Sequence, residues 1–223
     1  MNITQRLQKL DPTLKQHNEG HWDEPFNSDA PGFSSFNDGG VEIEVGELLY
    51  SLVRLIKPEN ILETGLYSAI STMYMAQALR ENGKGKIDTV EFEIKHVVRS
   101  RTRLEKLGLI DFVTIHHTDA RAFLPAPGIR YELILLDTEP QTRFEELLKF
   151  YDNLAPGGFL FIHDLHRHMH QISNADHNFA WPFGPIPDAM RELVRDGKLR
   201  PFHFSTPRGL TGFYRVAESD YKW

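Results

Sequence analysis

The sequence predicts a doubly wound α/β domain, in which helices cover both faces of a mostly parallel sheet. Beyond residue 41, short apolar runs alternate with segments of helical hydrophobic spacing. Two of these runs, 133–136 and 159–162, are apolar throughout, as strands buried on both faces of a sheet are. Repeated strand–helix units of this length pair in parallel, because each helix crosses back over the sheet to the start of the next strand.

The first regular elements are a helix, a strand and a second helix. Apolar residues at helical spacing from Val45 to Ile56, followed by Pro58, predict an amphipathic helix. The short apolar run from Asn60 to Gly65 is typical of a buried strand that ends at a glycine turn. Helical spacing returns from Ser71 to Leu79 and ends at Asn82-Gly83.

The same alternation continues to residue 216. Gly108 ends one helical segment, and Ala155-Pro156-Gly157-Gly158 ends another. The last two strands are separated by the short link Thr206 to Leu210, which favours an antiparallel pair. The remaining predicted strands are 87–91, 113–117, 131–137, 159–163, 202–205 and 212–216, and the remaining predicted helices are 95–107, 143–154 and 186–194.

Residues 1–40 differ from the rest and predict a loop-rich N-terminal arm before a single domain at 41–223. Asn, Asp, Gly, Pro and Ser are frequent in this arm, which also holds four large aromatic residues: Trp22, Phe26, Phe33 and Phe36. These aromatic side chains indicate that the arm packs on something, either the core, a partner subunit or a substrate pocket.

Composition narrows the class of partner. The 223 residues carry a formal charge of −6 without a dense basic run, which argues against nucleic acid or an anionic membrane surface and favours a small-molecule partner. The absence of cysteine excludes disulfides, thiolate metal sites and a cysteine nucleophile. No window approaches the roughly 18 apolar residues of a membrane span, so we expect a soluble, cytoplasmic protein. The oligomeric state is left open, with a homo-oligomer among the alternatives.

The candidate binding residues lie where the predicted strands end. In open α/β sheets, ligands bind beyond the carboxyl ends of the strands, at the place where the strand order reverses. Gly65 permits a sharp turn there, and Ser68 and Ser71 begin the next helix, whose free N–H groups suit a carboxylate or phosphate. Glu91 could accept two hydrogen bonds from ribose hydroxyls, and Asp119 one from an adenine amino group. These positions predict a site for a nucleoside-containing cofactor.

The segment Ile61-Leu62-Glu63-Thr64-Gly65-Leu66-Tyr67-Ser68-Ala69-Ile70-Ser71 resembles the first motif of the class I S-adenosylmethionine-dependent methyltransferases. Within them it is most similar to the cation-dependent catechol and caffeoyl-CoA O-methyltransferase group. The resemblance continues in order through Thr89-Val90-Glu91, His117-Thr118-Asp119-Ala120, Leu135-Leu136-Asp137, Pro156-Gly157-Gly158 and Ile162-His163-Asp164. It implies a Rossmann-like sheet of seven strands with an antiparallel C-terminal hairpin. A nicotinamide dehydrogenase also fits the alternation, but its Gly-x-Gly-x-x-Gly fingerprint is missing after the first strand.

The resemblance also assigns roles to individual residues toward S-adenosylmethionine. It implies that Glu63 and Gly65 line the methionine and sulfonium region and that Ser71 meets the carboxylate. The whole implied cofactor set is Glu63, Gly65, Tyr67, Ser71, Glu91 and Asp119. One departure is Ala69, which replaces the second glycine of the motif and would crowd the closest backbone approach to the cofactor.

The same resemblance implies a divalent cation, usually magnesium, that chelates two acceptor oxygens and lowers a hydroxyl pKa. In that group the ion is held by one aspartate after the fourth strand and by an Asp-Asn pair after the fifth, which Asp137 and Asp164 match. The asparagine is replaced here by Leu165, and the lysine that acts as base is replaced by Pro140.

Histidines surround the second aspartate. His163, His166, His168 and His170 flank Asp164, and imidazole favours zinc, iron, nickel or manganese over magnesium. We therefore expect a metal site built from Asp137, Asp164 and one or two of His163, His166 and His168, and we assign His163 to it together with the two aspartates. A general-base role for His166 or His168 without metal, next to a catalytic Asp137, is the first alternative, and a solvent-exposed loop is the second.

Two further features near the predicted cleft each allow two interpretations. Arg143 and Arg167 are candidates to bind a substrate carboxylate or phosphate, or else are solvated surface charges. The loop 173–187, which contains Trp181-Pro182-Phe183-Gly184-Pro185, suits the wall of a pocket for a flat aromatic acceptor or a packed surface loop.

Three functions follow from these observations. The leading hypothesis is a small-molecule O-methyltransferase, with metal assistance as an option. The second is a domain that binds a nucleoside or metabolite without methylating it. The third is a hydrolase or oxygenase that uses a His/Asp metal site on the same scaffold.

Overall fold

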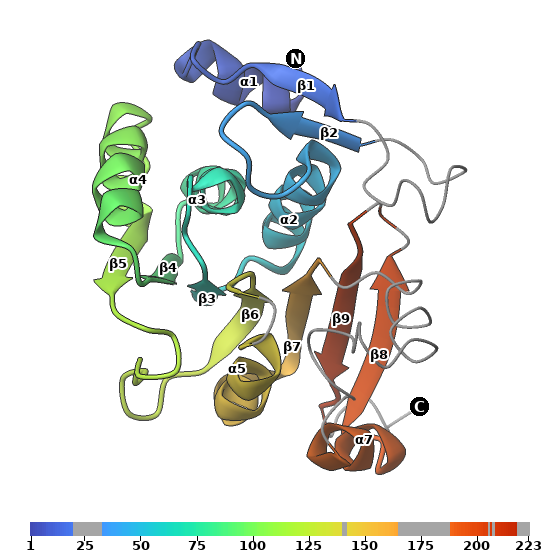
Figure 1. Cartoon of the computed structure of the whole chain (residues 1–223). Helices are drawn as coiled ribbons and strands as arrows, with labels where there is room; N and C mark the ends of the chain where they lie inside the picture. The colour runs from blue at the N-terminus through green and yellow to red at the C-terminus, as the bar shows by residue number, and fades with distance from the viewer. Residues whose placement is uncertain (20–32, 140–141, 165–187, 205, 207, 218–223) are drawn as a thin grey trace, which may run out of the picture.

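The computed structural model describes residues 1–19, 33–139, 142–164, 188–204, 206 and 208–217. Its centre is a seven-stranded sheet (Figure 1). The strands are β3 (Asn60–Thr64), β4 (Lys86–Glu91), β5 (Val113–His117), β6 (Tyr131–Leu136), β7 (Leu154–His163), β8 (Leu199–Phe204) and β9 (Leu210–Arg215). They lie in the order β5-β4-β3-β6-β7-β9-β8.

The pairing of the strands confirms the predicted fold class. Strands β5, β4, β3, β6 and β7 are parallel, whereas β9 runs antiparallel to both β7 and β8. The chain builds outward from β3 to β5 and then returns to place β6 on the other side of β3. The order thus reverses between β3 and β6, and a crevice is expected at the carboxyl ends of these two strands.

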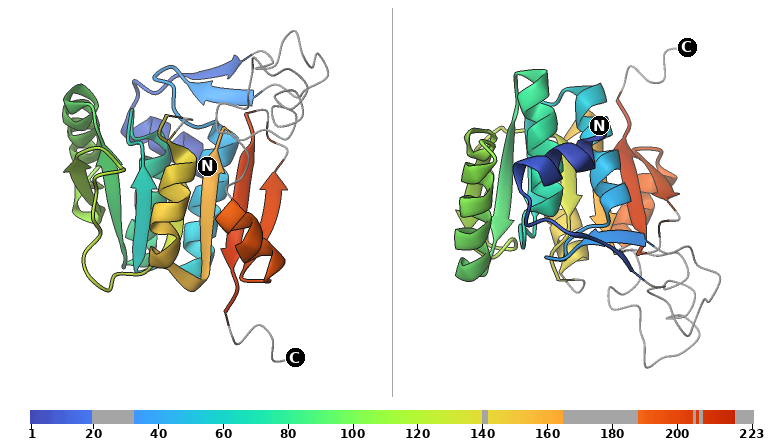
Figure 2. Two further views of the ribbon diagram at one scale, coloured as in Figure 1. Left: turned by 60° about the horizontal axis from the view of Figure 1, so that its bottom comes forward. Right: turned by 90° about the horizontal axis from the view of Figure 1, so that it is seen from above.

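Helices cover both faces of the sheet, as Figures 1 and 2 show. Helices α2 (Ile43–Ile56), α3 (Ile70–Asn82) and α4 (Ile94–Lys106) lie on one face, and α5 (Arg143–Phe150) and α7 (Asp188–Arg195) lie on the other. Two short 3-10 helices, η1 (Ile110–Phe112) and η2 (Tyr151–Asn153), precede β5 and β7.

Alternate residues of the central strands enter two different cores. Leu133 and Leu135 of β6 pack with α2 and α3, whereas Ile134 and Leu136 pack with α5. Because both faces of β6 are buried, its sequence has to be apolar without interruption. Among the described helices, none has both the length and the apolar character that a membrane-crossing helix requires.

The start of β7 differs from the prediction. The strand begins at Leu154, and Pro156-Gly157-Gly158 lies inside it, where the pairing with β6 shifts register between Tyr131 and Leu133. A proline cannot donate to a strand ladder, and an irregularity of this kind accommodates it. The segment that suggested a break is therefore a bulge within a longer strand.

The N-terminal arm holds more regular structure than predicted. It contains α1 (Ile3–Leu10) and the antiparallel pair β1 (Gln16–Glu19) and β2 (Phe33–Phe36), which Figure 2 shows across the edge where the parallel strands end. The two strands have only four residues each, too few for a clear hydrophobic period. The helix does carry Ile3 and Leu7 at helical spacing after the cap residue Asn2, a signal that the prediction did not use. Phe36 is buried in the core with α2 and α3, so the expected packing of the arm on the core is confirmed for this residue. Trp22 and Phe26 lie outside the described residues, and the boundary at residue 40 stays a prediction.

Candidate active site at the carboxyl ends of the parallel strands

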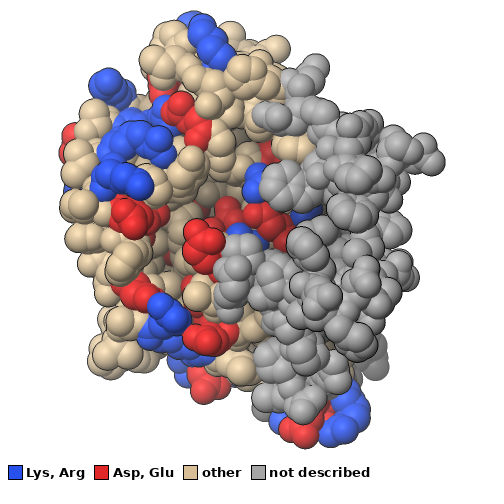
Figure 3. All heavy atoms as spheres, viewed as in Figure 1, with Lys and Arg blue, Asp and Glu red and all other residues tan. Residues whose placement is uncertain are grey.

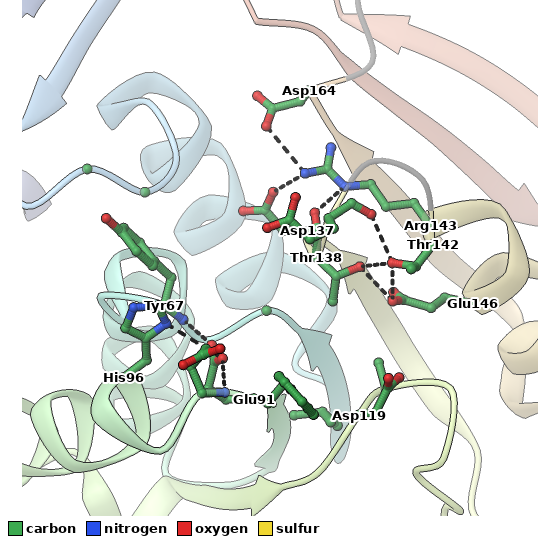
Figure 4. Close-up of a pocket in the computed structure, with 18 of the residues that line it drawn as sticks. Tyr67, Glu91, His96, Asp119, Asp137, Thr138, Thr142, Arg143, Glu146 and Asp164 are labelled. Carbon is green, nitrogen blue, oxygen red and sulfur yellow. Dashed lines mark hydrogen bonds and ion pairs between the residues drawn. The ribbon is translucent and has the colours of Figure 1, made fainter. Parts of the chain in front are cut away.

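A cleft of about 820 Å³ opens at the edge where β3, β4 and β6 end. Figure 3 shows that acidic and basic side chains gather on the floor of this hollow. One part of its wall carries Tyr67 and Glu91, and another carries Asp137 and Arg143, as Figure 4 shows. The N-terminal arm contributes Gly39-Gly40, so it also reaches the pocket, which is another of the alternatives that its sequence left open.

Gly65 joins the ends of β3 and β6. Its φ is +90°, and a Cβ at this position would lie 2.2 Å from the backbone oxygen of Asp137. The Gly65 N–H donates to the Val90 carbonyl at 2.9 Å, and the Asp137 N–H donates to the Thr64 carbonyl at 2.9 Å. Both the torsion and the close approach require glycine, which confirms the predicted sharp turn.

Glu91 is held in place by backbone donors. Its carboxylate accepts hydrogen bonds from the N–H of Tyr67 and from that of Glu93, each at 2.8 Å. The ring of Tyr67 stands edge-on to His96 with the centroids 4.7 Å apart. Tyr67, Glu91 and His96 therefore form one pre-arranged polar wall of the cleft (Figure 4).

Asp119 lies on the same part of the cleft wall as Glu91. The Thr118 N–H donates to the Glu91 carbonyl at 3.0 Å and so ties the two segments together. Asp119 accepts from the Arg121 backbone at 2.8 Å and from its guanidinium Nη2 at 2.7 Å. These hydrogen bonds from Arg121 lower the pKa of Asp119, so the carboxylate is ionised at neutral pH.

Glu63 and Ser71 are placed differently from the predicted cofactor contacts. Glu63 is fully buried and accepts hydrogen bonds from Ser71 Oγ at 2.6 Å, Thr72 Oγ1 at 2.6 Å and Thr89 Oγ1 at 2.7 Å. Burial raises the pKa of Glu63 to about 7. Neither Glu63 nor Ser71 is among the residues that line the cleft, because they bond to each other inside the fold.

Ala69 lies at the start of α3, outside the lining of the cleft. The residue has a left-handed φ of +62° at the start of α3, and its methyl group is completely buried in the core beside that helix. Ala69 does not line the pocket, and the predicted crowding of the cofactor by its methyl group stays a prediction.

Asp137, His163 and Asp164 come together as predicted, with one candidate ligand atom from each within 4.8 Å of the others. His163 is completely buried, and its Nδ1 lies 3.0 Å from Asp137 Oδ1 and 3.5 Å from Asp164 Oδ1. Its Nε2 bonds to the carboxylate of Glu42, the residue that precedes α2. Burial by itself would lower the pKa of His163, but the charges of Asp137 and Asp164, with the hydrogen bonds, raise it to about 10.

Two guanidinium groups stand against the same aspartates. Arg143 is only 3% exposed, and its Nη2 lies 3.3 Å from Oδ1 of Asp137 and 3.3 Å from Oδ2 of Asp164, as drawn in Figure 4. The alternative that Arg143 is a solvated surface charge is therefore wrong. Arg208 approaches Asp164 with Nε at 2.7 Å from Oδ1 and with Nη2 at 2.9 Å from Oδ2. Burial would raise the pKa of Asp164, but His163, Arg208 and Arg143 outweigh burial and lower it.

This arrangement determines how well the group fits a metal ion. The aspartate oxygens that would ligate the ion already face guanidinium nitrogens, and both nitrogens of His163 face carboxylates. A ring nitrogen that is hydrogen-bonded to a carboxylate cannot ligate an ion at the same time. As arranged here, the predicted set of Asp137, Asp164 and His163 is therefore grouped correctly but does not fit a divalent ion. The other predicted candidates, His166 and His168, lie outside the described residues. The same holds for Pro140, Leu165, Arg167 and the loop 173–187.

Three charged residues of the site escaped the sequence prediction: Glu42, Glu146 and Arg208. Glu146 is buried at the cleft, where it accepts hydrogen bonds from Thr64 and Thr138 at 2.6 Å each, and burial raises its pKa. Its position on the apolar stripe of α5, next to Leu147, was a usable signal. Glu42 and Arg208 had no such signal, because each lies in a connecting segment.

Comparison with known proteins agrees with the motif order. Residues 62–165 match the family model described as a methyltransferase domain. A catechol O-methyltransferase of Niastella koreensis is 28% identical over 123 residues, which cover 53% of this chain and 54% of that protein. A catechol O-methyltransferase of Mycobacterium tuberculosis is 26% identical over 102 residues, which cover 45% of this chain and 46% of that protein. The matched region thus spans about half the length of these relatives.

Solved structures resemble a larger part of the chain. An O-methyltransferase from Streptomyces achromogenes involved in tomaymycin synthesis, in complex with SAM, has a TM-score of 0.68 and 19% identity, covering 81% of this chain and 83% of that one. An O-methyltransferase from Bacillus cereus in complex with SAH has a TM-score of 0.65 and 18% identity, covering 79% and 83%. At this identity the likeness shows a shared fold.

Proposed function

Because residues 62–165 form a methyltransferase domain of the class I type, we propose that the protein is an S-adenosylmethionine-dependent O-methyltransferase of small molecules. The observation that carries this proposal is the Glu91 carboxylate, which two backbone N–H groups hold at the wall of the cleft. It stands at the end of β4, beside the point where the strand order reverses.

The hydrogen-bond acceptors of the cleft fit a nucleoside. Glu91 offers carboxylate oxygens for ribose hydroxyls, and Asp119 offers acceptors for an amino group. Val90, Phe92 and Ala120 supply apolar surface around them. We propose that this part of the cleft, with Gly65 and Tyr67, holds S-adenosylmethionine, which supplies a methyl group on a sulfonium sulfur.

The rest of the cleft suits a hydroxylated acceptor. Methyl transfer is an in-line displacement, so the chain has to align the acceptor oxygen and favour its ionised form. Asp137 lies at this wall and is proposed to accept the hydrogen bond of the acceptor hydroxyl and orient it. The positive charges of Arg143 and Arg208 lower the pKa of a hydroxyl placed beside them. The names of the curated relatives favour a phenolic acceptor of the catechol type.

The composition of the chain bears on the class of acceptor and on the cellular compartment. A formal charge of −6 without a basic run favours a small-molecule acceptor over nucleic acid, and we propose that the protein acts in the cytoplasm. A homo-oligomer stays an untested prediction.

Isothermal titration calorimetry with S-adenosylmethionine and its demethylated product tests the cofactor half of the proposal. We expect wild-type protein to bind both, and Glu91→Ala to bind each at least tenfold more weakly. Glu105→Ala removes the same charge from an exposed position of α4 and should bind like the wild type. Failure of the wild type to bind either compound at millimolar concentration would refute the proposal.

Turnover of radiolabelled cofactor tests the methyl transfer itself. A panel of catechols, simple phenols, hydroxy acids and amines should give labelled product with at least one hydroxylated member. Tight cofactor binding without any labelled product would instead favour a domain that binds a nucleoside without methylating it.

A further inference from the structure

We infer that Arg143 and Arg208 take the place of the divalent cation between Asp137 and Asp164, so that the acceptor site works without a metal. The chemical meaning of this inference rests on the proposed methyl transfer. The geometric observations and the metal-binding test below do not depend on that proposal.

The first argument is the position of the guanidinium nitrogens. Nη2 of Arg208 donates a hydrogen bond to Oδ2 of Asp164 at 2.9 Å. Nε of Arg208 lies 2.7 Å from Oδ1 of Asp164, as an ion pair without hydrogen-bond geometry. Arg143 Nη2 bridges the two aspartates at 3.3 Å from an oxygen of each. A metal ion held by Asp137 and Asp164 needs these oxygens at shorter distances still, so ion and guanidinium compete for the same place.

The second argument is that both arginines are anchored by further contacts. Arg143 donates to the Thr138 carbonyl at 2.7 Å and to the His163 carbonyl. Arg208 donates to the Gly40 carbonyl at 2.6 Å. Arg143 also lies in the first turn of α5, where the helix dipole disfavours a cation, so the surrounding carboxylates have to hold it there. If a metal ion displaced either arginine, a mostly buried guanidinium group would lose its carboxylate partners, which is energetically costly.

The third argument is the charge that already occupies this space. Among the described residues, the guanidinium groups of Arg143 and Arg208 bring two fixed positive charges to the carboxylates of Asp137 and Asp164. Nδ1 of the buried His163 ring faces Asp137 and Nε2 faces Glu42, so both ring nitrogens are already engaged by carboxylates. A divalent ion would add two further positive charges to this largely buried group.

The cluster also faces the cleft and is locally strained, which a purely structural ion pair does not require. Asp137, Arg143, Asp164 and Arg208 all line the pocket. Asp164 adopts a left-handed φ of +55°, a torsion that a non-glycine residue holds only when its surroundings impose it. The site therefore presents guanidinium charge to an acceptor oxygen and should take acceptors whose hydroxyl ionises readily, such as phenols.

Titration of the full-length wild type with Mn²⁺, followed by electron paramagnetic resonance, tests the inference without any assay of activity. We expect no stoichiometric binding at millimolar Mn²⁺. Arg208→Met removes the charge while keeping an unbranched side chain, and should gain a Mn²⁺ site. Adding Asp164→Asn to that variant should abolish the gain.

The outcomes are decisive in both directions. Stoichiometric binding by the wild type that Asp164→Asn abolishes would overturn the inference, as would a folded Arg208→Met that gains no site. Circular dichroism confirms folding, and the wild-type titration stays informative if the variant does not fold. Calorimetry with S-adenosylmethionine on the same wild-type sample separates the two proposals, because failure to bind the cofactor would remove the proposed function and leave the Mn²⁺ result unchanged. Once an acceptor is known, turnover should persist after treatment with a chelator.

Discussion

The Nδ1 atom of His163 lies 3.0 Å from Oδ1 of Asp137, which joins the ends of the neighbouring strands β7 and β6 inside the protein. The other ring nitrogen bonds to Glu42 at the start of α2. One buried imidazolium thus connects three elements that are far apart in the sequence. It also supports the wall of the cleft on which Asp137 stands.

His163 should make stability depend on pH in the alkaline range. Its pKa is raised from 6.5 to about 10, so its contribution is fully present below pH 6.5 and is lost as the pH rises through 10. His163→Gln should lower the free energy of unfolding at pH 7 by about 3–5 kcal/mol and remove this dependence. Urea unfolding of both proteins between pH 6 and 10 measures the difference. The exposed His17→Gln is the control, and an equal slope in wild type and His163→Gln would contradict the assignment.

Glu63 should produce a separate effect in the acidic range. Because burial raises its pKa from 4.5 to about 7, its neutral form stabilises the fold below pH 4.5, and that contribution disappears as the pH passes 7. Glu63→Gln keeps an uncharged group among the three hydroxyls. Relative to wild type it should therefore gain on the order of 3 kcal/mol between pH 4.5 and pH 8. Chemical unfolding at both pH values checks this, with the exposed Glu105→Gln as control. A constant difference between the two proteins would argue against a neutral buried Glu63.

Gly65→Ala should destabilise the protein more than an ordinary glycine substitution at positive φ. A Cβ would meet the Asp137 backbone oxygen at 2.2 Å, and the alanine would also have to adopt a φ of +90°. We expect a loss of about 2–5 kcal/mol from strain and overpacking together. Gly83→Ala is the matched control, because Gly83 also has a positive φ but has open space around it, and should lose only about 1–2 kcal/mol. If Gly65→Ala and Gly83→Ala lost the same free energy of unfolding, β3 and β6 would be able to move apart without an energetic cost.

Phe92 should bind the base of the cofactor. The ring lines the cleft next to Glu91 and is 65% exposed, so it is available for stacking. Phe92→Ala should weaken S-adenosylmethionine binding by about 1–3 kcal/mol while leaving thermal stability nearly unchanged. Calorimetry and a thermal melt measure the two quantities. Leu124→Ala, at another highly exposed apolar position, should change neither, and unaltered affinity in Phe92→Ala would place the base elsewhere.

The sequence by itself determined the fold class and the strand ends that form the cleft. Hydrophobic period is local, and strand 113–117 was predicted with its observed bounds. Because parallel strands end at one edge of a sheet, residues such as Gly65, Glu91 and Asp137 could be assigned to one cleft without knowledge of any contact. The bulge in β7 was missed, since proline and glycine mark a break and a strand irregularity in the same way.

Only the tertiary structure decided which charges meet at that cleft. Glu42 is 121 residues from His163, and Arg208 is 44 residues from Asp164, yet both pairs are in contact. Their approach depends on how α2 and β9 pack beside β7, which no local pattern encodes. The same packing turned Glu63 and Ser71 toward each other and filled the space between two aspartates with guanidinium groups. The physical reason is that burial forces charged and polar groups to find partners, and those partners come from whichever segments the fold brings near.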